Sequence, residues 1–253
     1  MWQEKIKLYV EMNEYNEKAR LIADKLKVDI VDNEKSIKDE DLILKLDSNG
    51  LSLIHKNMIL HGDFTKNMKR LSPGKIQSEL LIKAAKIKDK KENLIAIDAT
   101  AGLGEDSLLL AYVGYKVYLY ENNPIINLLL RDTIERAKQV PELEKIVCRM
   151  EVIEKDSVKA MHELDFKPDV ILLDPMFPER KKTALVKKKF QLLHFLESPC
   201  SDEEAMLEAA IFAKPRKIVI KRPLKGEYLA KRKPDFSLKG KSIRYDCILL
   251  HAI

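Results

Sequence analysis

The sequence predicts an α/β protein with a mostly parallel sheet covered by helices on both faces, preceded by a small N-terminal α+β unit. From residue 94 onward, short apolar runs alternate with helical segments, which is typical of parallel strands joined by crossover helices. The first 64 residues lack this alternation. Residues 245–251 are expected to form a last, antiparallel strand of the sheet. We therefore expect a subdomain at residues 1–65 and a larger domain at residues 66–253.

The N-terminal unit should contain a helix and a hairpin. Residues 14–26 carry apolar side chains at helical spacing, and residues 42–46 and 51–55 alternate as strands do. Asn49-Gly50 lies between these strands, and both residues tolerate the positive φ angles of a tight hairpin turn. A helix over residues 72–86 is expected next, because it opens with a Ser-Pro-Gly sequence.

The larger domain should alternate strands and helices. The expected strands are residues 94–97, 117–120, 152–153, 170–173, 218–220 and 247–250. The expected helices are residues 106–112, 125–139, 157–164, 183–196 and 202–212.

The composition is that of a globular protein, with 45% hydrophobic residues and a formal charge of +6 over 253 residues. No apolar run reaches the roughly 18–20 residues of a membrane-spanning helix, and the first residues do not resemble a signal peptide, so we expect a cytosolic, cytoplasmic protein. The cysteines are far apart, which argues against disulfides or a zinc site and favours reduced, buried thiols. They are Cys148, Cys200 and Cys247.

The charge is distributed unevenly along the chain. Residues 1–65 carry a net charge of −3, residues 66–93 carry +6, residues 94–178 carry −6 and residues 179–253 carry +9. The basic stretches have two interpretations: they are solvated helix faces, or they converge on one surface and neutralise phosphates.

The clearest motif runs from Asp98 to Asp106, contains Gly102 and Gly104, and lies between a predicted strand and a predicted helix. Such a loop borders the crevice at the carboxyl ends of parallel strands, and its glycines allow a ligand to approach the backbone closely. Asp98, Glu105 and Asp106 disfavour a pyrophosphate and favour a ligand with a cationic end, such as S-adenosylmethionine (SAM). Asp106 also has a purely structural interpretation, as the N-cap of the helix.

Acidic residues also follow the next two strands. Glu121 lies 17 residues beyond Gly104 at the end of a strand, where a carboxylate accepts hydrogen bonds from ribose hydroxyls. Asp156 would either accept a hydrogen bond from an adenine amino group or cap the helix that begins near Ser157. Glu121 thus gives independent support for a nucleoside ligand.

The fourth strand ends in the sequence Asp-Pro-Met-Phe-Pro, which begins at Asp174. The prolines constrain the backbone while an acid and an aromatic ring point toward the ligand. Alkylation of an exocyclic amine requires acceptors for its two N–H groups, and the Asp174 carboxylate and the Pro175 carbonyl are the candidates. Phe177 would stack on an unpaired base. The alternative is a strand that simply ends at a proline, with Phe177 in the core.

These motifs resemble those of class I SAM-dependent methyltransferases, which have a Rossmann-like sheet, and Asp-Pro-Met-Phe resembles the Asp/Asn-Pro-Pro-Tyr/Phe signature of amino-group methyltransferases. More narrowly, the sequence is similar to the RsmJ family from about Lys69 to its C-terminus. The similar phrases are Asp98-Ala-Thr-Ala-Gly-Leu-Gly, Glu121-Asn-Asn-Pro, Leu173-Asp-Pro-Met-Phe-Pro followed by Ala184-Leu-Val-Lys-Lys, and Val219-Ile-Lys-Arg-Pro.

The resemblance implies transfer of a methyl group from SAM to the N2 amine of a guanine in small-subunit (16S) ribosomal RNA. It implies cofactor contacts at Glu105, Asp106, Glu121, Asn122, Asp156, Ser157 and Asp174. Two alternatives stay open: an amino-group methyltransferase for another base, such as adenine at N6, or a non-catalytic ribosome-assembly protein with a vestigial cofactor pocket.

Basic residues around the reactive segment are expected to form an RNA-binding collar. They are Lys69, Arg70, Arg180, Lys181, Lys182, Lys221 and Arg222. The five histidines show no metal-ligand spacing, so no metal is expected. Catalysis would rest on positioning rather than on a protein nucleophile or general base.

Overall fold

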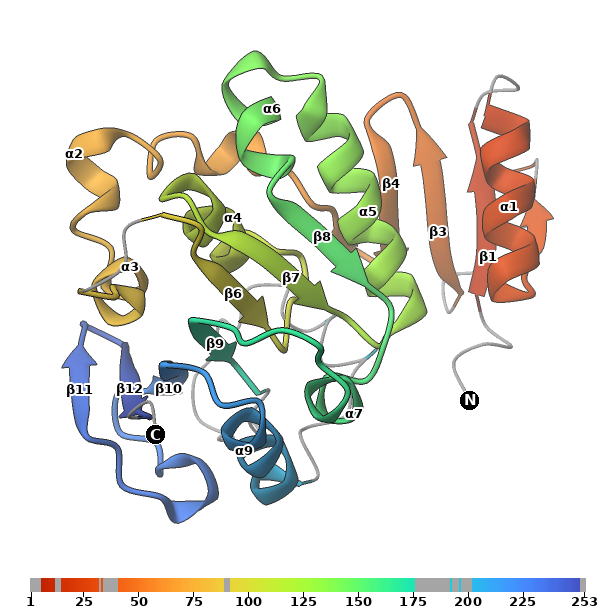
Figure 1. Cartoon of the computed structure of the whole chain (residues 1–253). Helices are drawn as coiled ribbons and strands as arrows, with labels where there is room; N and C mark the ends of the chain where they lie inside the picture. Colours follow the sequence, from red (N-terminus) through yellow and green to blue (C-terminus); the bar gives the residue numbers. More distant parts are fainter. Residues whose placement is uncertain are drawn as a thin grey trace.

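The computed structural model describes residues 6–11, 15–31, 33, 41–88, 92–175, 192, 196 and 202–250, and the fold is that of these residues. A seven-stranded sheet with the order β11-β12-β10-β9-β6-β7-β8 forms the centre of the molecule (Figure 1). Its strands are β6 (Ile95–Asp98), β7 (Lys116–Tyr120), β8 (Met150–Ile153), β9 (Val170–Leu173), β10 (Lys217–Pro223), β11 (Phe236–Lys239) and β12 (Ile243–Leu249).

The strands from β10 to β8 are all parallel, and β12 is antiparallel to both of its neighbours. This confirms the predicted parallel sheet with an antiparallel strand near the C-terminus. The chain order reverses between β6 and β9, because β7 and β8 extend the sheet on one side of β6 while β9 and β10 extend it on the other. In open α/β sheets, ligands bind at the carboxyl ends of the strands at such a switch point.

Helices cover both faces of the sheet, because strand side chains alternate between the faces and both faces are apolar. On β9, Val170 and Leu172 pack into one core layer, while Ile171 and Leu173 pack into the other. The first layer includes α3 (Leu80–Ala85), α4 (Glu105–Tyr112), α5 (Pro124–Lys138) and α6 (Pro141–Val147). The second includes α7 (Ser157–His162) and α9 (Glu203–Phe212).

The N-terminal unit is a five-stranded sheet with the order β2-β1-β3-β4-β5 and one helix, α1. Its elements are β1 (Ile6–Val10), α1 (Asn16–Leu26), β2 (Asp29–Val31), β3 (Leu42–Asp47), β4 (Gly50–His55) and β5 (Met58–Leu60). The predicted hairpin is confirmed as β3–β4, but Gly50 begins β4 opposite Asp47 with a φ of 98°, and Asn49 does not adopt a positive φ. The parallel strands β1 and β2 were not predicted.

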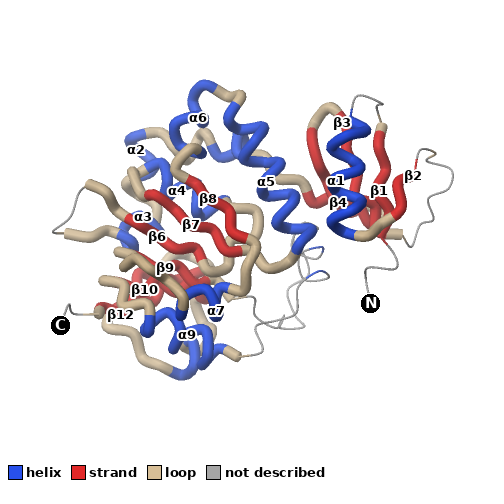
Figure 2. The backbone as a smooth tube through the Cα atoms, turned by 45° about the vertical axis from the view of Figure 1, so that its right-hand side comes forward, coloured by secondary structure: helices blue, strands red, loops and turns tan. Residues whose placement is uncertain are grey.

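Helix α5 lies between the two sheets (Figures 1 and 2). Leu130 and Ile134 pack with the core of the seven-stranded sheet, whereas Ile126 and Leu129 pack with the core of the N-terminal unit. The described parts of both units therefore share one helix as a structural element.

Two expectations need correction. The helix expected over residues 72–86 is two short helices, α2 (Pro73–Ile76) and α3, because Glu79 between them has an extended backbone with a ψ of 129°. The Glu79 carboxylate there binds the Arg70 guanidinium through two hydrogen bonds of 2.9 Å. Cys148 is exposed, not buried, whereas Cys247 is buried as expected. Cys200 and most of the helix expected over residues 183–196 lie outside the described residues. No helix in the described ranges combines the length and the apolar character that a bilayer crossing requires.

Candidate active site at the carboxyl edge of the sheet

Asp98 ends β6 at the switch point and is almost fully buried, with 2% exposure. Its carboxylate accepts hydrogen bonds from the Ser107 hydroxyl at 2.6 Å and from the Thr100 backbone N–H at 3.2 Å. Burial, with a smaller contribution from the nearby Asp106 carboxylate, raises the pKa of Asp98 to about 7 against the opposing effect of the Ser107 hydrogen bond. Asp98 is therefore a buried group that a neighbouring cation would help to ionise.

The glycine turn after β6 needs both of its glycines, for different reasons. Gly102 and Gly104 have φ angles of 53° and 75°, which L side chains rarely adopt. A Cβ on Gly104 would lie 2.7 Å from the Leu130 Cδ1 atom, so this position is also closely packed. A Cβ on Gly102 would meet nothing within 4 Å, so the backbone there borders open space. The turn leads into α4, which begins with Glu105 and Asp106 and has Gly104 as its N-cap, so the interpretation of Asp106 as the N-cap is wrong.

Glu121 follows β7 and reaches the glycine turn. Its carboxylate accepts hydrogen bonds from the Gly102 N–H at 3.1 Å and from the Asn123 N–H at 2.8 Å. Glu121 is 6% exposed, and Asn122 next to it is exposed. Carboxylate oxygens have two lone pairs each, so Glu121 retains the capacity to accept hydrogen bonds from a ligand.

Asp156 caps α7, because its carboxylate accepts hydrogen bonds from the backbone N–H groups of Val158 at 2.9 Å and Lys159 at 3.2 Å. The capping interpretation of Asp156 is thus confirmed. Contact of Asp156 and of the buried Ser157 with a ligand stays a prediction.

Asp174 directly follows β9, and Lys221 of β10 joins it to Asp106. The Lys221 ammonium lies 2.7 Å from an Asp106 carboxylate oxygen and 2.8 Å from Asp174 Oδ2. The Asp174 backbone N–H donates to the Thr100 hydroxyl at 2.7 Å. Pro175 is buried. The carboxyl edge of the sheet thereby brings together the carboxylates of Asp98, Asp106 and Asp174. Asp98 and Asp174 are 76 positions apart in the sequence.

The electrostatics of this cluster follow from burial and from pairing. Desolvation raises the pKa of Asp174, and the Lys221 ammonium opposes this increase. Desolvation lowers the pKa of Lys221, but the Asp106 and Asp174 carboxylates together outweigh it and raise the pKa above its ordinary value. Tyr245 lies opposite Lys221 in the β10–β12 pair, and burial raises its pKa.

The residues expected to bind RNA differ in their exposure and in their partners. Lys69 is exposed, Arg70 is paired with Glu79, and Lys221 is held by its two carboxylates. Arg222 is only 4% exposed, and its guanidinium donates to Glu203 at 3.1 Å and to the Glu227 carbonyl at 2.8 Å. Burial and these two partners favour a structural role for Arg222, and its contact with RNA stays a prediction. Phe177, Arg180, Lys181 and Lys182 lie outside the described residues.

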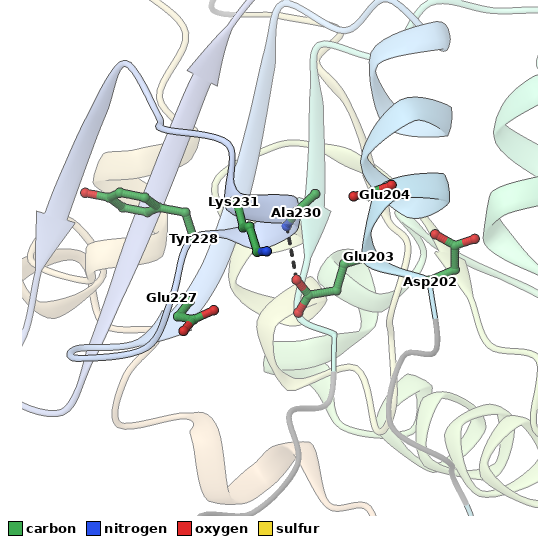
Figure 3. Close-up of a pocket in the computed structure, with 7 residues that line it drawn as sticks. All are labelled: Asp202, Glu203, Glu204, Glu227, Tyr228, Ala230 and Lys231. Carbon is green, nitrogen blue, oxygen red and sulfur yellow. Dashed lines mark hydrogen bonds between the residues drawn. The ribbon is translucent and has the colours of Figure 1, made fainter.

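An acidic hollow lies between the start of α9 and the connection around η5 (Leu229–Lys231), and Figure 3 shows its lining. Its volume is about 380 Å³. Glu203 accepts a hydrogen bond from the Ala230 N–H at 3.0 Å there. The residues that line it are Asp202, Glu203, Glu204, Glu227, Tyr228, Ala230 and Lys231. Four carboxylates make this hollow unsuited to phosphate groups.

Sequence reasoning missed three supporting residues. Thr100 anchors the Asp174 backbone, Ser107 holds the Asp98 carboxylate, and Asn127 donates to the Glu121 carbonyl at 3.2 Å. The hydroxyl groups within the glycine motif and directly after it were the available signal for the first two. Among the described ranges, no group of His, Cys, Asp and Glu side chains could hold a metal ion.

The sheet topology, the glycine turn and the acidic edge together define a class I SAM-dependent methyltransferase. A family described as "Putative SAM-dependent methyltransferase" matches residues 23–250. A crystal structure of a SAM-dependent methyltransferase from Neisseria gonorrhoeae superposes with a TM-score of 0.76 at 27% identity, covering 98% of this chain and 97% of that one.

Curated relatives narrow the class to one family. Ribosomal RNA small subunit methyltransferase J from Thioalkalivibrio sulfidiphilus is 39% identical over 214 residues, which are 81% of this chain and 83% of that protein. The protein of the same name from Nitrosococcus oceani is 43% identical over 157 residues, which are 61% of this chain and 62% of that protein. The chain belongs to the ribosomal RNA small subunit methyltransferase J (RsmJ) family.

Proposed function

We propose that this SAM-dependent methyltransferase methylates the N2 amine of a guanine in small-subunit ribosomal RNA. The observation that carries the proposal is the position of Asp174 and Pro175 at the end of β9, beside the glycine turn. The family membership supports the RNA substrate, because the relatives are named ribosomal RNA small subunit methyltransferases. The Asp-Pro-Met-Phe motif supports the choice of an exocyclic amine.

The residues at the carboxyl edge fit SAM by the chemistry of their donor and acceptor groups. When bound, SAM supplies a methyl group on a positively charged sulfur. Asp98 and Asp106 offer carboxylates to its ammonium group, and Glu121 offers acceptors to the ribose hydroxyls. We assign the adenine side to Asp156 and Ser157, which follow β8. The open space beside Gly102 lets the ligand approach the backbone.

Asp174 and Pro175 hold the substrate amine in this proposal. Their carboxylate and carbonyl accept its two N–H groups, which orients the nitrogen lone pair away from them and toward the methyl donor. The lone pair of the substrate is the nucleophile, so the chain contributes orientation and electrostatics. Stacking of the base on Phe177 stays a prediction, because Phe177 lies outside the described residues.

A group of exposed lysines at the carboxyl edge supports RNA as the substrate. We call Lys69, Lys225 and Lys241 the lysine rim. Lys69 precedes Arg70, whose pKa is raised chiefly by Glu79, with further contributions from Asp106 and Glu105, so this segment lies near the acidic edge. Lys225 and Lys241 lie on neighbouring connections, because the Leu224 N–H donates to the Ser242 carbonyl at 2.9 Å. Cations at this rim can neutralise phosphates around the acidic site.

Replacement of the three rim lysines by alanine should weaken binding to small-subunit ribosomal RNA. The slope of log affinity against log salt concentration should decrease by about 1 for each lysine that contacts a phosphate. SAM affinity should stay at the wild-type value, because the rim is separate from the cofactor residues. Fluorescence binding titrations at several salt concentrations measure both quantities.

The matched control is a triple alanine variant of Lys116, Lys145 and Lys167. All three are exposed and lie toward the amino edge of the sheet: Lys116 begins β7, Lys145 lies in α6 before β8, and Lys167 precedes β9. The control removes the same charge and should leave the RNA salt slope unchanged. Equal losses in both variants would mean that RNA responds only to net charge, and the rim would be rejected.

The proposed function is tested by analysis of nucleosides from small-subunit ribosomal RNA of a strain that lacks this gene. We expect one N2-methylguanosine to be lost and to return when the intact chain is supplied on a plasmid. An unchanged nucleoside profile would reject the proposal, and loss of a methylated adenine would replace guanine with another base.

A further inference from the structure

Lys221 is an ammonium group enclosed by acidic residues from other elements. It contacts Asp106 in the first turn of α4 and Asp174 after β9, at 2.7 and 2.8 Å. The side chains of Lys221, Asp106 and Asp174 are 26%, 18% and 36% exposed, so all three are partly buried. A lysine in this position is already neutralised and is a poor ligand for a phosphate.

The charged and titratable groups around the Lys221–Asp174 pair come from five elements. Asp98 of β6, Asp106 of α4, Arg222 of β10 and Tyr245 of β12 interact with the pair itself, and Arg70 before α2 interacts with Asp106 and Tyr245. Arg222 and Arg70 are bound to Glu203 and Glu79, respectively. Lys221 is thus the cation that binds Asp174 directly among the described residues.

Asp174 is anchored at two points, one on its backbone and one on its carboxylate. Thr100 accepts a hydrogen bond from its backbone N–H at 2.7 Å, which sets the position of the residue after β9. Lys221 binds Oδ2 at 2.8 Å, which sets the rotation of the carboxylate. Two anchors of this kind leave Oδ1 as the oxygen with a defined direction for a further ligand.

We propose that Lys221 is the positioning residue of Asp174: it holds Oδ2 and thereby presents Oδ1 to the N–H group of the substrate amine. This inference rests on the proposed function, because it concerns the same amine. It differs from the RNA-contact role that the sequence indicated for Lys221. Lys221 acts on orientation within the site, whereas an RNA contact would act on substrate affinity.

Lys221 also keeps Asp174 able to accept a hydrogen bond. Burial raises the pKa of Asp174 and Lys221 lowers it, so removal of the ammonium raises this pKa further. A protonated carboxyl group is a poorer acceptor, and activity that depends on ionised Asp174 is lost as the pH falls through its pKa. Loss of Lys221 should therefore move the acid limb of the pH–rate profile to higher pH.

The test replaces Lys221 with methionine, which keeps the length and the apolar stem of the side chain. We expect kcat on small ribosomal subunits to fall on the order of 10²-fold, while the KM for RNA and its salt dependence stay near wild-type values. The acid limb of the kcat profile should shift to higher pH. Lys221→Arg should recover most of the loss, because a guanidinium can bind both carboxylates.

Two measurements and one control separate positioning from a general structural effect. Thermal unfolding identifies a variant that fails to fold, in which case Lys221→Arg carries the test through the same pH profile. Calorimetry should show that Lys221→Met binds SAM at least as tightly as the wild type does. The substitution removes a cation that would repel the positively charged ligand. Lys167→Met removes an exposed lysine before β9, at the amino edge, and should behave like the wild type.

Several outcomes would overturn the inference. A kcat within about threefold of wild type with an unmoved acid limb would show that Lys221 does not position Asp174. A raised KM for RNA with a flatter salt dependence would return Lys221 to the RNA-binding role. Tighter SAM binding with an undiminished kcat would mean that Lys221 only occupies the place of the cofactor's ammonium. Absence of guanine methylation by the wild-type protein would instead reject the proposed function, which distinguishes the two failures.

Discussion

Asp174→Ala should reduce kcat on the order of 10²–10³-fold while leaving the protein folded and able to bind SAM. The substitution removes the carboxylate that we assign to the substrate amine and leaves Pro175 as the remaining acceptor. Asp174 is at the end of β9 and 36% exposed, so the core packing of the strand does not depend on its side chain. Transfer of labelled methyl groups to small ribosomal subunits measures kcat, and calorimetry measures SAM binding.

Asp174→Asn is the matched variant for this prediction. Asparagine keeps one acceptor oxygen at the same place, and it occurs at this position of the Asp/Asn-Pro-Pro-Tyr/Phe signature that the motif resembles. It loses the charge that pairs with Lys221. We therefore expect an activity between those of the alanine variant and the wild type. A fully active Asp174→Ala protein would refute the role of Asp174.

Asp132→Ala should lower the free energy of unfolding by about 3 kcal/mol, because it breaks a buried charge network between the two sheets. Asp132 of α5 has a side chain that is 3% exposed. Its carboxylate accepts from the Leu51 N–H, from Arg136 Nε and from the Lys18 ammonium, at 2.8, 2.8 and 2.6 Å. Lys18 is 48% exposed and contributes little, so most of the loss comes from Arg136 and the Leu51 N–H.

Glu135→Ala is the control for Asp132, on the same helix. Glu135 is 64% exposed and pairs only with the exposed Lys138 among the described residues, so its loss should cost less than about 0.5 kcal/mol. Chemical denaturation, followed by fluorescence and circular dichroism, measures both variants. A loss below about 1 kcal/mol for Asp132→Ala would show that the network does not join the units energetically.

Asp132 also makes the stability of the fold sensitive to acid. Desolvation raises the pKa of Asp132, but the hydrogen bonds from Lys18, Leu51 and Arg136 outweigh it and hold the folded-state pKa below the ordinary value of 3.8. The stabilisation is present above pH 3.8 and is lost as the pH falls through the lower folded-state pKa.

The division of the chain into two domains at residues 65 and 66 stays a proposal. We expect one cooperative unfolding transition for the described units, because α5 packs with the cores of both.

The parallel sheet could be predicted because its strands are short apolar runs separated by helical segments. The runs that became β6, β9 and β10 are largely buried on both faces, which removes the polar alternation and leaves a plain apolar run. β2, with the sequence Asp-Ile-Val, is a three-residue strand at the side of its sheet and carries no such signal. The break at Glu79 was hidden because it depends on a tertiary partner, Arg70.

The candidate site was predictable where its chemistry lies at strand ends. Asp98, Glu121 and Asp174 follow apolar runs directly, and parallel strands bring such ends together. The roles of Lys221 and Arg222 were not predictable, because adjacent positions on a strand point to opposite faces and both carry positive charge. Only the structure distinguishes their partners. Lys221 binds carboxylates of the site, whereas Arg222 binds Glu203 of the acidic hollow.

The most direct test of the account is an assay of the purified wild-type chain with small ribosomal subunits from a strain that lacks this gene, using SAM with a deuterated methyl group. Nucleosides from the product RNA are then separated and identified by mass spectrometry. We expect deuterium label in N2-methylguanosine and a large reduction of this label when Asp174→Ala replaces the wild type. Label in a methylated adenine, or no label in any nucleoside, would contradict it.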